Sequence, residues 1–287
     1  SSVLTTGGIK LQTMTQARLY AYLRDDTLAE HRKTGYNLEE ARVAILEWTG
    51  QDTSKGEIWK SLRNKTIPYN IRGFLWKAMH SAYMTGDYWR DVPGHEQRID
   101  CHECGEESSL RHILTQCRAS GQGVIWAEVE KVWQLKKLPW HGVSLGMILG
   151  CSMLNLRTAS GCALKGPSRL LKILVSESSH LAWKIYWEWT IELNADPQRR
   201  LSEDEVRKHW IRVMNSRLLL DMIQIGNFMG HPWTNKTKFG HRAIPPQLVE
   251  STWWDVLQDK QSLGDDWINQ RRGVLVGTER RPPGRNR

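Results

Sequence analysis

The sequence predicts a mostly α-helical protein, with helical bundles, little or no sheet, and one inserted segment rich in cysteine and histidine. Apolar residues recur at steps of three and four along most of the chain, which is the period of a helix with one buried face. Serine, asparagine and proline stand where these periodic segments begin, as expected of helix starts. Strand-like alternation is limited to Val-Leu-Val at 274–276, and no fixed-period repeat occurs.

Two helices are predicted in the first fifty residues. Residues 1–10 carry no periodic pattern and are interpreted as the end of a linker from an upstream domain, because the chain also lacks an initiator methionine. The first helix is expected over 11–23. The second is expected over 38–48, where Asn37 and Glu40 have the spacing of a capping box.

Two more helices precede the cysteine-rich segment. Ser54 can cap a short helix that runs through Leu62, and Pro68 opens a longer one, since proline is favoured at the first helical position. The longer helix carries an apolar stripe that should face a core. The stripe consists of Ile71, Leu75, Ala78, Met79 and Ala82.

The helical pattern resumes after the cysteine-rich segment. It covers 124–135 and ends at Pro139 and Gly142. Pro167 opens the most apolar segment of the chain, 170–193, in which large apolar residues occupy more than one side. This segment is predicted to be a helix buried nearly all round and the central element of a second helical unit.

Two helices are predicted in the remainder of the chain. Ser202 and Glu205 form a capping box that starts a helix to about Ile225. A polar, glycine-marked loop follows, and Pro245 with Pro246 starts the last long helix. The domain prediction is therefore a helical unit over 11–140 that contains the knuckle at 101–117, a second unit over 141–270, and a basic, disordered tail over 271–287.

The segment 101–117, CHECGEESSLRHILTQC, has the donor pattern of a zinc knuckle. Cys101 and Cys104 are spaced so that a tight turn, helped by Gly105, can aim both sulfurs at one point about 2.3 Å away. Ser109 or Ser108 can cap a helical turn that delivers the two further ligands, His112 and Cys117. Four protein ligands leave no position for water, so the one expected Zn²⁺ is structural and not catalytic.

Other interpretations of these residues remain open at this stage. The thiols can be ordinary buried cysteines beside a surface histidine, or two of them can form a disulfide. His102 is adjacent and is an alternative ligand. Cys151 and Cys162 lie among small and apolar residues without a nearby histidine, and the sequence assigns them no task.

Composition places the chain among soluble globular proteins, with 287 residues, 40% hydrophobic and 25% charged. No run of apolar residues approaches a membrane span and no signal peptide is recognisable, so an intracellular location, nuclear or cytoplasmic, is expected. The formal net charge is +9, and six arginines against one glutamate lie between Arg271 and Arg287. Such a tail can hold phosphates or serve only as a solubilising terminus.

Nine arginines are candidates for nucleic-acid contact because they flank the knuckle or lie in the tail. They are Arg90, Arg98, Arg111, Arg118, Arg271, Arg272, Arg280, Arg281 and Arg285. The chain also has fifteen tryptophans against three phenylalanines. Indole faces can stack on bases, but most of these tryptophans occur at helical spacing beside apolar residues, which favours core packing. Trp253 or Trp254 is the expected exposed exception.

The knuckle and the helix before it resemble the zinc-binding region of non-LTR retrotransposon reverse transcriptases. The resemblance rests on FLWKAMHSAYMTGDYW at 74–89, then CHECGEE, LRHILTQC and Trp126, with a somewhat short loop before His112. Three later segments, 176–191, 205–218 and 267–277, resemble the carboxy-terminal region of fungal members less specifically. The resemblance covers most of the chain after about residue 10.

This resemblance implies a piece that lies downstream of a polymerase and a ribonuclease H domain in the same polypeptide. Those domains are then expected partners, together with RNA or DNA, and neither a membrane nor a small-molecule substrate is expected. Asp25-Asp26 and Asp265-Asp266 do not have the context of a polymerase carboxylate pair. Gly-rich phosphate loops and the serine- or metallo-hydrolase motifs are absent from the sequence, so no enzyme is predicted.

Three functions compete on this basis. The leading one is a non-catalytic nucleic-acid-binding accessory domain whose knuckle positions an RNA or DNA strand for the upstream polymerase. The second is a scaffold in which zinc joins helices and tryptophan-rich surfaces bind the parent polypeptide or another subunit. The third is an inactive remnant of a retroelement.

Overall fold

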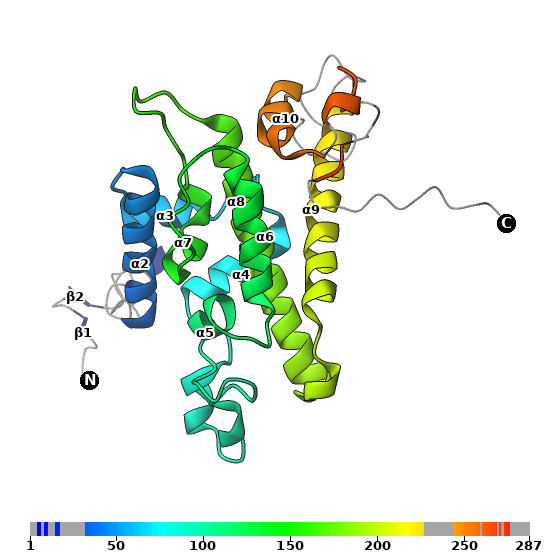
Figure 1. Ribbon diagram of the computed structural model, residues 1–287. Helices are drawn as coiled ribbons and strands as arrows, with labels where there is room; N and C mark the ends of the chain where they lie inside the picture. The colour runs from blue at the N-terminus through cyan, green and yellow to red at the C-terminus, as the bar shows by residue number, and fades with distance from the viewer. Residues whose placement is uncertain are drawn as a thin grey trace.

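The computed structural model of the chain confirms the mostly α-helical prediction (Figure 1). It describes residues 5–6, 9–10, 15–17, 32–226, 244–258, 260–268, 270 and 273–275. The only named strands in these ranges are β1 (Thr5–Thr6) and β2 (Ile9–Lys10), which pair antiparallel. Most of the predicted helix over 11–23 and most of the tail over 271–287 lie outside the described residues.

Nine α-helices fall in the described ranges. They are α2 (Arg32–Thr49), α3 (Lys55–Ser61), α4 (Tyr69–Met79), α5 (Leu110–Thr115), α6 (Gln122–Gln134), α7 (Leu145–Leu149), α8 (Lys165–Trp187), α9 (Glu203–Gly226) and α10 (Pro246–Trp253). Short 3₁₀ turns join them at η2 (Gly86–Asp91), η3 (Glu96–Arg98), η4 (Cys151–Met153), η6 (Pro197–Arg199), η7 (Trp254–Val256) and η8 (Lys260–Ser262). None of the described helices is both long and apolar enough to cross a membrane.

The predicted capping box at Ser202 is present, and the predicted cap at Ser54 also forms a capping box, which was not predicted. Ser54 Oγ accepts from the amide of Glu57, and the Glu57 carboxylate accepts from the amide of Ser54 at 2.9 Å. Ser202 and Glu205 make the same pair of bonds at the start of α9. These local bonds satisfy amides that the first helical turn leaves without partners, so their sequence signature is sufficient.

The predicted cap at Asn37 is wrong. Helix α2 begins at Arg32, and Asn37 lies inside it, 6% exposed. Its Nδ2 donates to the carbonyl of Met79 at 2.9 Å and to Ser81 Oγ at 2.9 Å. The amide side chain therefore satisfies the end of α4 and not the start of its own helix.

Helix α8 is the central element, as predicted, and neighbouring helices surround it (Figure 1). It begins at Lys165 and ends at Trp187, so the expected single helix to 193 is too long. A π-helical turn, η5 (Glu188–Glu192), follows it. Helices α4, α5, α6, α9 and α10 all contact α8, which explains why its apolar residues occupy several sides.

One contiguous set of buried apolar residues extends from Leu38 to Leu275 and joins the helices before residue 140 to those after it. Helix α2 packs on α7, and α6 packs on both α8 and α9. The division into units at 11–140 and 141–270 remains a prediction. In the Val-Leu-Val segment, Leu275 forms an isolated antiparallel bridge with Leu257, and the carbonyl of Val274 accepts from the amide of Gln258 at 2.7 Å.

Most of the described tryptophans are buried or half-buried, as helical spacing predicts. The expected exposed exception at Trp253 is wrong, because Trp253 is fully buried and Trp254 is half-buried. Among the described tryptophans, the exposed ones are instead Trp76, 51% exposed, and Trp187, 45% exposed. The sequence did not reveal the burial of Trp253, because this burial depends on how α10 packs. Trp253 is the last residue of α10, and α10 contacts both α8 and α9.

A buried charge network joins α8, α9 and α10. Asp221 is fully buried, and both of its carboxylate oxygens accept from the guanidinium of Arg169, at 2.6 and 2.8 Å. Trp253 Nε1 also donates to Asp221 at 2.7 Å, and Arg217 Nη2 lies 3.6 Å away. The three helices thus share one carboxylate.

Helices α2 and α7 approach so closely that only glycine fits at one position. A Cβ on Gly146 would lie 2.3 Å from the carbonyl oxygen of Glu40. Gly146→Ala is therefore expected to lower the free energy of unfolding by about 1–3 kcal/mol, because the helices must separate. Urea unfolding followed by circular dichroism measures it.

Gly73→Ala is the matched control. Gly73 is exposed in the interior of α4, and a Cβ there meets no atom within 4 Å. This variant is expected to gain about 0.5–1 kcal/mol through helix propensity. Equal effects of the two substitutions would contradict the close approach.

Candidate metal centre

The Cys101–Cys104 turn is built by backbone hydrogen bonds within the knuckle. The amide of Gly105 donates to the carbonyl of Cys101 at 2.8 Å, and the amide of Cys101 donates to Glu106 O at 2.7 Å. Gly105 has a φ of +71°, the left-handed conformation predicted for it. The turn therefore presents Cys101 and Cys104 on the same side.

Helix α5 supplies the other two donors. Ser109 is its N-cap, and its Oγ accepts a hydrogen bond from the amide of His112 at 3.1 Å. Ser109 is one of the two serines that the sequence indicated as candidates for this cap. Cys117 follows the end of the helix, and its amide donates to the carbonyl of His112 at 2.7 Å. One short helix thus fixes His112 and Cys117 relative to each other.

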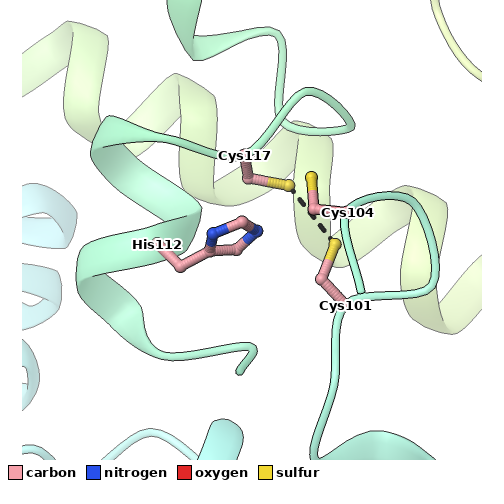
Figure 2. A group of neighbouring side chains, drawn as sticks. All are labelled: Cys101, Cys104, His112 and Cys117. Atoms are coloured by element: carbon pink, nitrogen blue, oxygen red, sulfur yellow. Dashed lines mark hydrogen bonds between the residues drawn. The ribbon is translucent and has the colours of Figure 1, made fainter. Parts of the chain in front are cut away.

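These elements bring four donor atoms together (Figure 2). One ligand atom from each of Cys101, Cys104, His112 and Cys117 lies within 4.8 Å of the others. The sulfurs of Cys101 and Cys117 are 3.6 Å apart. Two thiolates on a tetrahedral zinc ion with bonds of about 2.3 Å are separated by about 3.8 Å, so this spacing fits one shared metal ion.

The environment of His112 also fits a metal ion. The imidazole is 2% exposed, and neither ring nitrogen has a hydrogen-bond partner. Figure 2 shows one ring nitrogen turned toward the three sulfurs. Glu106 Oε2 lies 3.3 Å from Nδ1. A buried polar group without a partner is costly, and a cation bound among the sulfurs would satisfy the ring.

The thiols affect one another's protonation. The hydrogen bond between Cys101 and Cys117 lowers the pKa of the Cys101 thiol and raises the pKa of the Cys117 thiol, and burial raises the latter further. The site therefore resists holding several thiolates without compensation. A bound dication would remove this repulsion and would let all three sulfurs act as ligands.

The geometry excludes two of the alternatives raised by the sequence, a disulfide and a place for His102 in the cluster. All five cysteines are free, and a separation of 3.6 Å is far beyond the S–S bond length of about 2.0 Å. His102 is exposed and does not belong to the cluster. Cys151 is fully buried, and burial raises the pKa of its thiol to about 12, whereas Cys162 is exposed.

The knuckle is anchored to the rest of the fold. Ser108 Oγ hydrogen-bonds the hydroxyl of Tyr186 near the end of α8. Trp126 Nε1 of α6 donates to the carbonyl of Leu114 in α5 at 2.8 Å. Arg200 pairs with Glu103 inside the Cys101–Cys104 turn. The four candidate ligands therefore lie on a loop and on a short helix that contacts α6 and α8.

The structure places four of the nine predicted arginines. Arg90 and Arg98 are exposed, and the Arg98 guanidinium lies 4.9 Å from the ring centroid of Trp89. Arg111 pairs with Glu40, and Arg118 Nη2 donates to the carbonyl of Glu103 at 3.2 Å. The other five, Arg271, Arg272, Arg280, Arg281 and Arg285, lie outside the described residues.

The sequence did not predict a small hollow that lies beside the knuckle. Trp89, Arg98, Trp183, Tyr186 and Trp187 line it, with a cavity of about 60 Å³. Its residues come mainly from η2, η3, the knuckle, the last turns of α8 and η5. Helical spacing placed Trp183 and Trp187 in a helix buried nearly all round, whereas Trp187 is 45% exposed. We refer to this feature as the aromatic groove.

The described part of the chain thus defines the class of protein: an all-α protein with a Cys₃His cluster that can hold a metal ion. Comparison with family models, with curated proteins and with solved structures finds no match to this chain. The Asp25-Asp26 pair lies outside the described residues, and Asp265 and Asp266 lie in a turn.

Proposed function

We propose that this chain is a non-catalytic nucleic-acid-binding accessory domain whose knuckle is held by one structural zinc ion. The aromatic groove next to the metal ligands carries the nucleic-acid part of this proposal. The donor set carries the zinc part.

Zinc suits the cluster better than other common ions. Three thiolates and one imidazole are soft to borderline donors, and such sets are typical of structural zinc. The four protein donors complete a tetrahedron. The ion would supply folding energy to a segment with few apolar residues and leave the chemistry of any reaction to other domains.

The aromatic groove has the components of a single-strand binding surface. Trp187 is 45% exposed at the end of α8, and Arg98 stacks on Trp89 across the hollow. Indole faces stack on any base, and arginine adds phosphate and cation–π contacts. The resemblance to the zinc-binding region of non-LTR retrotransposon reverse transcriptases is in keeping with such a role beside an upstream polymerase and ribonuclease H.

A second function is favoured by the charge of the knuckle. Residues 86–118 contain seven carboxylates against four arginines. Glu40 pairs with Arg111, while Lys33 and Arg200 pair with Asp87 and Glu103, so carboxylates remain in excess among the unpaired groups. A locally acidic surface repels a phosphate backbone. The same aromatic groove can then bind a segment of the parent polypeptide, and zinc would serve a scaffold.

Fluorescence anisotropy of labelled single-stranded RNA and single-stranded DNA tests the proposed function. Trp187→Ala is expected to weaken binding roughly tenfold, because base–indole stacking contributes about 1–3 kcal/mol. Trp76→Ala is the matched control, because Trp76 is equally exposed but lies on α4, outside the groove.

The salt dependence separates the two functions. Affinity for nucleic acid should fall steeply between about 50 mM and about 200 mM salt if phosphates are bound. If binding to single-stranded RNA and to single-stranded DNA is absent or does not depend on salt, the nucleic-acid function is excluded and the scaffold function remains. An equal loss in Trp187→Ala and Trp76→Ala would show that the groove is not the binding surface.

A further inference from the structure

A second cavity, of about 400 Å³, lies at the opposite end of α8 from the knuckle. Its walls include the first turns of α8 and the hairpin of residues 156–164, which projects from the helical body (Figure 1). The hairpin is closed by the Arg157–Ala163 bridge and by the amide of Leu164, which donates to the carbonyl of Leu156 at 2.9 Å. The cavity shares no residue with the metal centre or the aromatic groove.

The wall of this cavity is strongly cationic. Four basic side chains line it, and no carboxylate occurs among the described residues of its lining. These are Arg157, Lys165, Arg169 and Lys172. Arg169 is neutralised by Asp221, whereas the described residues include no ion-pair partner for the other three. The nearby Asp52, next to the lining residue Gln51, is already paired with Arg42.

Of the four basic residues, Lys172 gives the strongest indication that the cavity binds an anion. It is 7% exposed, and its Nζ donates to the uncharged amide oxygen of Asn155 at 2.5 Å. Burial lowers the pKa of its ammonium, and the described residues place no carboxylate within 4.0 Å of it. An ammonium buried without an anion destabilises the fold, so the arrangement is one that a bound anion would complete.

The size and polarity of the cavity indicate the ligand class. A volume near 400 Å³ is within the range of about 300–1,000 Å³ typical of small-molecule sites, and it exceeds what one monoatomic ion needs. Ser168 and Thr66 add hydroxyl groups to the lining. Converging lysine and arginine side chains match the several oxygens and the multiple charge of a phosphate group.

We propose that this cavity binds a small phosphate-bearing ligand, with the buried Lys172 at its floor and the exposed Arg157 and Lys165 at its mouth. The ligand's anionic group replaces the carboxylate that Lys172 lacks. The proposal is independent of the zinc site and of the aromatic groove.

Thermal unfolding and isothermal titration calorimetry with inorganic pyrophosphate test the proposal. Pyrophosphate is expected to raise the unfolding midpoint of the full chain, because a ligand that binds only the native state stabilises it. Lys172→Met is expected to lose this shift and to bind at least about tenfold more weakly, since a charge-assisted hydrogen bond is removed. Without ligand, its midpoint should equal or exceed that of the parent chain, because an unpaired buried charge has been removed.

A second variant distinguishes loss of ligand binding from a loss of folding caused by Lys172→Met. Arg157→Gln with Lys165→Gln changes only exposed side chains and should also lose the pyrophosphate shift. Lys184→Gln with Lys208→Gln removes the same charge from exposed positions outside the cavity and should keep it. A parallel titration with ADP distinguishes the ligand: tighter binding than pyrophosphate indicates a nucleotide, and equal binding indicates recognition of the phosphate alone.

Two results would overturn the proposal. The first is the absence of any midpoint shift with either probe in the parent chain. The second is a shift of the same size in the cavity variants and in the Lys184/Lys208 control, which would reflect net charge alone.

Discussion

Cys101→Ser is expected to abolish stoichiometric zinc binding and to loosen residues 101–117. Cys101 is 1% exposed, and its sulfur lies 3.6 Å from that of Cys117, so no other donor can replace it without rearrangement of the turn. Apparent zinc-binding energies of roughly 10–16 kcal/mol in zinc-finger peptides set the upper limit of the stabilisation lost. The segment is expected to depend on this energy, because charged and polar residues dominate it.

Metal content by mass spectrometry and hydrogen exchange of the backbone amides measure this effect. One zinc per chain is expected in the parent protein and none in Cys101→Ser, with faster exchange confined first to the knuckle and α5. Cys162→Ser is the matched control, because Cys162 is an exposed free thiol outside the cluster. Retention of one zinc by Cys101→Ser would falsify the ligand assignment.

Asp221→Ala is expected to produce the second large effect, a loss of about 3–5 kcal/mol in the free energy of unfolding. The substitution leaves the guanidinium of Arg169 buried without its carboxylate and removes the acceptor of Trp253 Nε1. Helices α8, α9 and α10 lose their common partner at once. Denaturant unfolding monitored by tryptophan fluorescence gives the magnitude.

Asp52→Ala is a control of the same chemistry. Asp52 also accepts two hydrogen bonds from one arginine, Arg42, at 2.8 and 2.9 Å, but this pair is exposed. Its loss should leave the unfolding midpoint nearly unchanged, because water solvates both partners after the change. A similar loss of stability in Asp52→Ala and Asp221→Ala would show that burial is not the cause.

Local signals in the sequence were sufficient for several elements. The cap at Ser54, the capping box at Ser202, the cap at Ser109 and the positive φ of Gly105 are confirmed, because each depends on atoms within a few residues. The cluster of Cys101, Cys104, His112 and Cys117 is also confirmed as a group of donors. A turn and a short helix suffice to bring these donors together.

Features that depend on contacts between distant segments were predicted wrongly or not at all. Asn37 has the spacing of a helix cap, yet it serves the carbonyl of Met79, forty-two residues away. Trp253 is fully buried, and its indole donates to Asp221, 32 residues earlier in the chain. Neither contact can be recognised from the periodicity or spacing of residues in the sequence, because the packing of whole helices determines which residues meet.

The chain alone thus determined the helical class and the four donors, because hydrogen bonds and side-chain periodicity within short segments encode both. Only the packed structure decided which charges are buried, which indoles face solvent and where cavities open. Arg169 and Lys172 illustrate this difference, since both lie on one face of α8 and both are buried. Asp221 on α9 neutralises the first, whereas no described carboxylate meets the second, because burial and pairing depend on the neighbouring helices.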